Sequence, residues 1–369
     1  MRSATQHKRA CTVSAFVVVV AVMWTATGAV AEGDADLAAL SADDLWAQAE
    51  QYRSEGDLAQ AKRLYTFIAD HHADNENRAS WALYRLCMLS YNERQIDAAL
   101  GYIQRVVDQY PDSGICRNGY AASYLTAIHL IFTKDYDAAI QVGEEQLARF
   151  GPQMAPLERA RVVERLAKSY LATGDYDGAL RVLQQNVLSY PGLLRWPEWY
   201  QTLFQTHIAH RDYAAALSTA RAAYALCDFE EKAIRDAADM VRRGFAVSGE
   251  VAKAVQFLQA QEDAQAPNPL RGVPLPQLTD QQREQLRAGA GDDRALRLLV
   301  FIYCGDDPAT LNEAVDRVAT AGADEAAAAL LDVARAFKAV DLNLVRANRF
   351  LDYARTGEGL NPLAEVEPQ

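Results

Sequence analysis

Apolar and polar positions alternate along most of this 369-residue chain with the period of an α-helix. Over residues 161–171, one helix face carries Val163, Leu166, Ala167 and Tyr170, the i, i+3, i+4, i+7 pattern. Gly174 can end this helix, Asp175 can cap a second one, and Tyr190-Pro191 stops the second helix. The pattern therefore predicts a helical hairpin.

The same hairpin pattern returns along the chain at a nearly fixed interval. A small residue marks the second helix of each unit, at Ala61, Ala99, Ala139, Ala179, Ala216 and Ala254, with gaps of 38, 40, 40, 37 and 38 residues. A small side chain is expected there because two helices that cross closely leave no room for a larger one. A period of this length predicts a stack of helical hairpins, which is an architecture that presents an extended surface for binding.

Several positions within the units match a known repeat. They are Ala49, Tyr52, Gly56 and Ala61 in the first unit, Leu86, Ala99 and Pro111 in the second, and Leu166, Ala167, Tyr170, Gly174, Ala179 and Pro191 in the fourth. Over residues 42–263 the chain resembles the tetratricopeptide repeat (TPR) family, and the Tyr110-Pro111 and Tyr190-Pro191 endings resemble the subset found in bacterial envelope proteins. The resemblance implies an all-α, right-handed helical-hairpin solenoid of about six TPR-like repeats, which binds a protein or peptide through its concave face.

The chain also departs from the family pattern. Its period exceeds the family's roughly 34 residues, so we expect longer helices or longer junctions between units. Arg94 and Lys134 stand where the turn glycine is expected, and Phe204 and Arg242 replace the small residue of the first helix. These departures make the fifth and sixth units the weakest matches.

Other segments fall outside the repeats. Residues 1–31 combine a basic start, an apolar stretch and Ala29-Val30-Ala31, which predicts a signal peptide cleaved after Ala31, with an uncleaved anchor as the alternative. The prolines of residues 264–277 predict a connector, because proline cannot continue a helix. Residues 278–356 predict two degenerate helical hairpins, and residues 357–369 a loose acidic tail.

Net charge and cysteine content indicate which classes of partner and which cellular compartment suit the protein. The formal net charge is −12, and cleavage of the basic segment makes it more negative, which disfavours nucleic acid and anionic membrane surfaces. We therefore expect no nucleic-acid partner and no membrane insertion after signal cleavage, with localisation in the periplasm or cell envelope. Cys87 fits a core thiol and Cys116 fits half of a disulfide better, but the spacing assigns no pairing.

Motifs for catalysis are missing from the sequence. It contains no GxSxG, HExxH, GxxxxGK or GxGxxG motif, so we expect neither an enzyme nor a cofactor. His207, His210 and Asp212 form the nearest approach to a metal site, but a closed site needs more ligands, and we predict no metal.

The predicted binding surface follows from laying the family's concave-face positions onto this chain. They place aromatic and apolar residues in the first three units and charged residues in the fourth: Trp46, Trp81, Tyr84, Met88, Tyr91, Tyr124, Ile128, Phe132, Arg161 and Lys168. An aromatic groove beside charges suits a peptide with apolar anchors and charged flanks, whereas the alternative is that these residues pack against one another.

The leading hypothesis is therefore an exported TPR scaffold that binds a protein or peptide partner. The alternative is the helical subunit of a cell-envelope, peptidoglycan-processing enzyme or assembly machine. Self-association through an end hairpin is a further hypothesis, because solenoids need capped ends.

Overall fold

The computed structural model describes residues 34–189, 197–263, 265–293, 297, 300 and 307–358. The predicted signal peptide, Cys304 and the tail beyond residue 358 lie outside the described residues. The chain divides into two units, residues 1–41 and 42–369. The first unit contributes one described helix, α1 (Asp34–Leu37).

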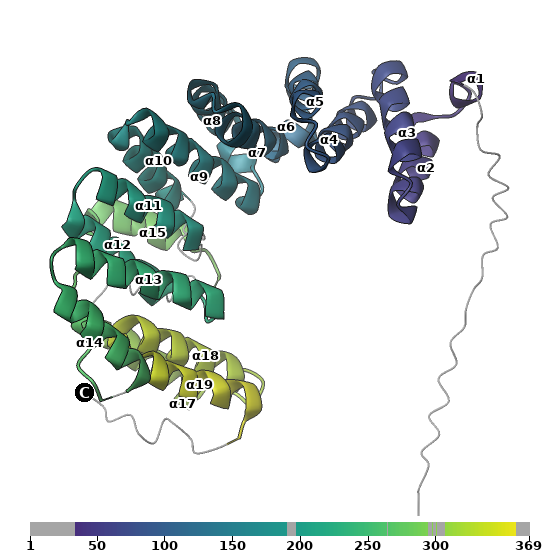
Figure 1. Ribbon diagram of the computed structural model, residues 1–369. Coiled ribbons are helices and arrows are strands. Elements are labelled where there is room, and N and C mark those ends of the chain that lie inside the picture. Colours follow the sequence, from purple (N-terminus) through teal and green to yellow (C-terminus); the bar gives the residue numbers. More distant parts are fainter. Residues whose placement is uncertain are drawn as a thin grey trace, which may run out of the picture. The chain divides into compact units, whose positions relative to one another are not determined.

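The second unit begins with six consecutive pairs of helices, each packed on the next (Figure 1). The pairs are α2 (Ala42–Glu55) with α3 (Leu58–His71), α4 (Glu76–Asn92) with α5 (Ile96–Gln109), α7 (Tyr120–Ala127) with α8 (Tyr136–Phe150), α9 (Pro156–Thr173) with α10 (Tyr176–Ser189), α11 (Pro197–Ala209) with α12 (Tyr213–Leu226), and α13 (Glu231–Val247) with α14 (Val251–Glu262). No strand occurs among the described residues. The predicted all-α helical-hairpin solenoid is confirmed.

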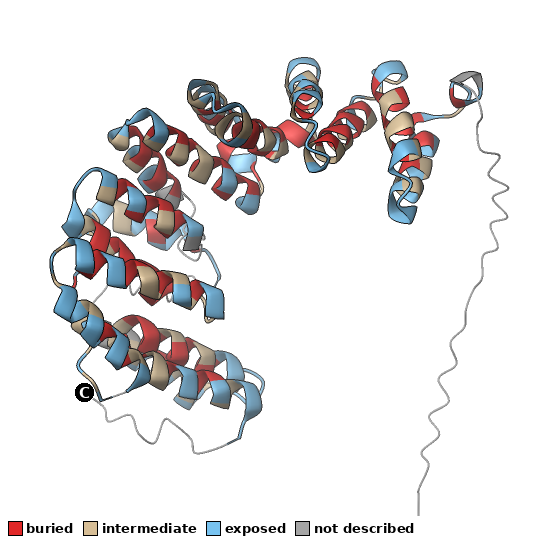
Figure 2. Ribbon diagram, viewed as in Figure 1, coloured by how far each residue is buried: buried red, intermediate tan, exposed pale blue. Residues whose placement is uncertain are grey.

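The repeated alanines lie where the paired helices meet. Five of them, Ala61, Ala99, Ala139, Ala179 and Ala216, have no exposed surface. Ala254 in α14 is only partly buried. Buried residues follow the facing sides of the helices through the stack (Figure 2), as close helix crossings require.

A left-handed residue precedes the second helix in each pair, whether or not it is glycine. Gly56 and Gly174 have φ of +86° and +82°, and Arg94, Lys134 and Arg211 adopt φ of 64°, 55° and 62°. An aspartate follows in four of the pairs and accepts a hydrogen bond from the main-chain N–H three residues on, at Asp57, Asp135, Asp175 and Asp212. The turn geometry is therefore kept where the glycine is lost, at the conformational cost that a side chain brings to this region.

The extra residues of the long period lie around the third pair. A short helix, α6 (Gly114–Arg117), precedes α7, the π-helix η1 (Ile128–Thr133) extends it, and the 3₁₀ turn η2 (Gly151–Gln153) follows α8. These insertions fall within the two intervals of 40 residues between repeated alanines. The expectation of longer helices or junctions is confirmed here.

Three of the described elements after residue 264 pack back on the second helices of the last three pairs. The elements are the 3₁₀ turn η4 (Pro269–Gly272), α15 (Asp280–Gly289), α17 (Asp307–Thr320), α18 (Ala326–Ala336), the π-helix η5 (Phe337–Asp341) and α19 (Leu344–Thr356). Helix α15 contacts α10, η5 contacts α12, and η4 contacts α14. Leu270 and Val273, from the proline-rich stretch, are buried in the same core as α9–α13. The prolines end the helix, but this stretch is part of the packed array.

The last helices form a hairpin with a core of their own. Helix α18 packs on α19 and on α17, and the Phe337 and Phe350 rings stack with centroids 4.8 Å apart. The hairpin predicted for the end of the repeats is confirmed for α18 and α19.

Candidate partner-binding surface

Six aromatic rings from α4, α7 and η1 form a continuous series, here called the aromatic ladder. Its members are Trp81, Tyr84 and Tyr91 on α4, Tyr120 and Tyr124 on α7, and Phe132 in η1. Neighbouring ring centroids lie between 5.3 and 6.0 Å apart. Packing of α4 against the next unit thus joins side chains that are far apart in the sequence.

Most contacts in the ladder are edge-to-face, the arrangement that aromatic quadrupoles favour. The interplanar angles are 87° for Tyr84 with Tyr124, 84° for Tyr91 with Tyr124 and 85° for Tyr91 with Phe132. Tyr84 keeps only 7 % of its surface exposed. The rings therefore hold one another rigidly, and much of their apolar surface is used in packing.

The tyrosine hydroxyls of the ladder are available for new hydrogen bonds. No described group hydrogen-bonds the hydroxyls of Tyr84, Tyr91, Tyr120 and Tyr124, and none of these four oxygens is fully buried. Burial of the rings raises the pKa of Tyr84 and of Tyr124, so both hydroxyls stay protonated at neutral pH and can donate as well as accept.

Three other predicted groove residues differ in their exposure. Ile128 is fully buried, so its side chain serves packing rather than an accessible surface. Met88 is half-buried, with its sulfur 3.9 Å from an Arg85 nitrogen. Trp46 packs on Tyr65 at 5.4 Å, and the Arg78 guanidinium lies 5.3 Å from its ring centroid. Trp46 has no ring contact with the ladder among the described residues.

The charged residues predicted for the fourth unit are paired within α9. Arg161 lies 2.7 Å from Glu158, and Lys168 pairs with Glu164. Between them lies Arg165, which forms no ion pair among the described residues and donates to Ser123, with 2.8 Å to Oγ. Burial lowers the pKa of the Arg165 guanidinium.

Sequence reasoning missed Tyr120 and Arg165. Tyr120 lies one helical turn before Tyr124, and Arg165 lies one turn after Arg161 and within one turn of Lys168, so the helical period could have suggested both. The fixed list of concave positions did not include either residue.

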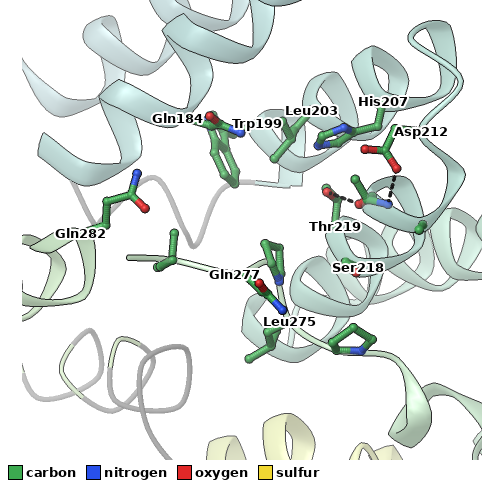
Figure 3. Close-up of a pocket in the computed structure, with 15 residues that line it drawn as sticks. Gln184, Trp199, Leu203, His207, Asp212, Ser218, Thr219, Leu275, Gln277 and Gln282 are labelled. Atoms are coloured by element: carbon green, nitrogen blue, oxygen red, sulfur yellow. Dashed lines mark hydrogen bonds between the residues drawn. The ribbon is translucent and has the colours of Figure 1, made fainter. Parts of the chain in front are cut away.

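A separate cavity of about 520 Å³ lies between α10–α12 and the segment of residues 274–282. Trp199 and Leu203 on α11 form one wall, and Leu275 and Gln277 lie opposite (Figure 3). Its volume is within the range of small-molecule pockets. The Trp199 indole N–H is already used, since it donates to the Leu183 carbonyl at 3.2 Å.

His207 and Asp212, from the pattern closest to a metal site in the sequence, both line this cavity. Burial lowers its pKa, its Nδ1 is buried without a partner, and Asp212 accepts from the Ala215 N–H as a helix cap. Among the described residues, no three histidine, cysteine or carboxylate side chains lie together as metal ligands. A search of the same residues finds no helix with the length and apolar character needed to cross a bilayer.

Comparison with protein-family models matches two stretches of the chain, residues 81–113 and 164–192, to the tetratricopeptide repeat. The first stretch covers most of α4 and α5, and the second covers the later part of α9 and all of α10. The matches support a TPR family, whose stacked repeats typically form non-catalytic surfaces for protein–protein interaction. No curated protein matches the chain.

Proposed function

We propose that this protein is an exported scaffold that binds a protein or peptide partner through the aromatic ladder. The observation that carries the proposal is the set of four tyrosine hydroxyls, each accessible and unpaired among the described residues, on rings held rigid by their neighbours. Tyrosines held in this way offer hydrogen bonds at low cost in conformational entropy, which is why they are common in binding surfaces.

The chemistry of the ladder favours hydrogen bonding over deep apolar anchoring. Because many ring faces are already covered by the edge of a neighbouring ring, the hydroxyls are the groups left to bond a partner, and an extended main chain offers matching N–H and C=O groups.

To test this, peptides that bind the full chain are first selected from a displayed random library. Binding of a selected peptide is compared between the native chain and a variant with Tyr84, Tyr91, Tyr120 and Tyr124 all changed to Phe. We expect affinity to fall at least about tenfold, because neutral hydrogen bonds contribute about 1 kcal/mol each. Thermal unfolding of the variant should stay unchanged, since these hydroxyls bond to no described group.

Tyr213→Phe is the matched control, because Tyr213 is an exposed tyrosine on α12, outside the ladder. It should leave peptide affinity as it is. Equal affinity of the native chain and the fourfold variant would place the binding surface elsewhere.

The exported location is a second part of the proposal. It rests on the basic and apolar pattern of residues 1–31 and on Ala29-Val30-Ala31. N-terminal sequencing of the protein from its native source should give a chain that starts at Glu32. A chain that retains residues 1–31 would favour an anchor instead.

A further inference from the structure

Cys227 and Lys338 meet in the core, although 111 residues separate them in the sequence. Cys227 follows the last turn of α12, and Lys338 belongs to η5, which packs on that helix. The Lys338 Nζ lies 3.2 Å from the Cys227 Sγ. Both side chains are buried, with Lys338 1 % and Cys227 4 % exposed.

The surroundings of the Lys338 amine are unusual for a lysine. Its Nζ donates to the Cys227 carbonyl oxygen and lies 5.2 Å from the Phe229 ring centroid, and no carboxylate pairs with it among the described residues. A buried amine is expected to have a carboxylate partner, because burial of a charge without one is costly. Capping of the end of α12 explains the bond to the carbonyl, but it does not require a thiol beside the amine.

We propose that Cys227 and Lys338 are the site of an oxidative cross-link in which sulfur and nitrogen become covalently bonded. In the first step hydrogen peroxide oxidises the Cys227 thiol to a sulfenic acid: the O–O bond breaks, one oxygen binds sulfur, and the other leaves as water. In the second step the Lys338 nitrogen attacks that sulfur. The S–O bond breaks, the hydroxyl leaves as water with a proton from the amine, and a remaining ammonium proton passes to solvent.

The other described cysteines lack this arrangement. Cys87 and Cys116 are buried free thiols, and neither contacts a lysine amine among the described residues. Burial raises the pKa of Cys87 to about 12 and also raises the pKa of Cys116, so both remain unreactive thiols near neutral pH. They are internal controls for the reaction.

The bond would fasten the C-terminal hairpin to the fifth helix pair. Closing a loop of this length restricts the unfolded chain strongly, so the cross-linked protein should resist unfolding more than the reduced form. The inference concerns the C-terminal region and does not depend on what the aromatic ladder binds.

The test is peptide mapping of the full chain after treatment with hydrogen peroxide, digested without reductant. We expect a linked peptide pair that joins Cys227 to Lys338, is lighter by two hydrogen atoms than the two free peptides, and is separated by dithiothreitol. Cys87 and Cys116 should be recovered as thiols.

Cys227→Ser and Lys338→Met are the matched variants, and neither should give the linked pair. If a variant does not fold, peptide mapping of the native chain still shows whether Cys227 and Lys338 become linked. Recovery of Cys227 as a sulfinic acid with an unmodified Lys338, or of all three cysteines oxidised alike, would overturn the proposal.

Discussion

The second and third helix pairs differ from the last three in what packs against them. On α4 and α7, which are first helices of their pairs, the aromatic ladder keeps four tyrosine hydroxyls accessible. The second helices α10, α12 and α14 are instead contacted by α15, η5 and η4, which come from later in the chain. The same hairpin architecture thus presents a ring surface that we propose as a binding site in one region, and it is covered by later parts of the chain in the other.

This comparison shows that a repeat's own sequence does not fix its role. Leu270 and Leu286 have no exposed surface, because the chain returns to cover the array where they lie. In the ladder region the aromatic rings pack on one another, and none of the four tyrosine hydroxyls is fully buried or hydrogen-bonded to a described group.

The covering segment should contribute strongly to stability. Leu270→Ala leaves a cavity beneath η4, so we expect the free energy of unfolding to fall by about 3 kcal/mol. Urea denaturation followed by circular dichroism measures the change. Leu58→Ala, at a position that is 37 % exposed, should cost much less. Equal losses would show that the segment is not packed on the array.

The ladder should depend on the Tyr84 ring for stability and on its hydroxyl only for binding. Tyr84→Ala removes ring contacts with Trp81, Tyr120 and Tyr124, so we expect a loss of about 2 kcal/mol. Tyr84→Phe keeps the ring and should leave the unfolding temperature unchanged. A large loss for Tyr84→Phe would mean that the hydroxyl has a structural partner.

The second helix pair lacks a cap that four other pairs possess. Gln95 precedes α5 at the N-cap position and forms no side-chain capping bond, whereas Asp57 caps α3 from the equivalent position. Gln95→Asp should therefore stabilise the protein by about 1 kcal/mol. Asp57→Ala is the reverse control and should destabilise it by a similar amount. Thermal unfolding checks both, and no gain from Gln95→Asp would show that the local turn cannot accept the cap.

One histidine in each region should make the free energy of unfolding depend weakly on pH, and both effects should have the same sign. Burial lowers the pKa of His129 in η1 and of His207 in α11 below the ordinary value of 6.5. The unfolded chain therefore binds protons first, and stability falls as pH drops below about 6.5 until the folded pKa is reached. His129→Gln and His207→Gln should each reduce the slope of unfolding free energy between about pH 5 and about pH 7. If neither variant changes the slope, other titratable groups cause the pH dependence of stability.

Much of the repeat architecture could be predicted because its rules are local. The spacing of Ala61, Ala99, Ala139, Ala179 and Ala216 identified the helix crossings, and each of these side chains is fully buried. The turns followed from the Gly-Asp pattern of the first and fourth units. Arg94 and Lys134 departed from it in sequence, yet the structure gives them the same left-handed conformation, because the packing of the helices fixes the turn.

The candidate site was predicted only in outline. Placement of Tyr84, Tyr91 and Tyr124 on one surface followed from the family's concave-face positions, but the contact of Tyr84 with Tyr120 depends on how α7 packs against α4. The additional elements α6 and η1 lie next to α7, and no local sequence pattern predicts how they position α7 against α4. For the same reason Ile128 could not be assigned to the interior beforehand.

The helices, their period, their crossing points and the aromatic residues on the first helices could all be predicted from local patterns, because these features depend on residues within one or two turns. Tertiary packing alone brought particular rings into contact, left four hydroxyls without a hydrogen-bond partner among the described residues, and returned η4, α15 and η5 to the array. It also brought Cys227 to Lys338. These contacts join residues far apart in the chain, and their free energy comes from burying surfaces that no local pattern pairs in advance.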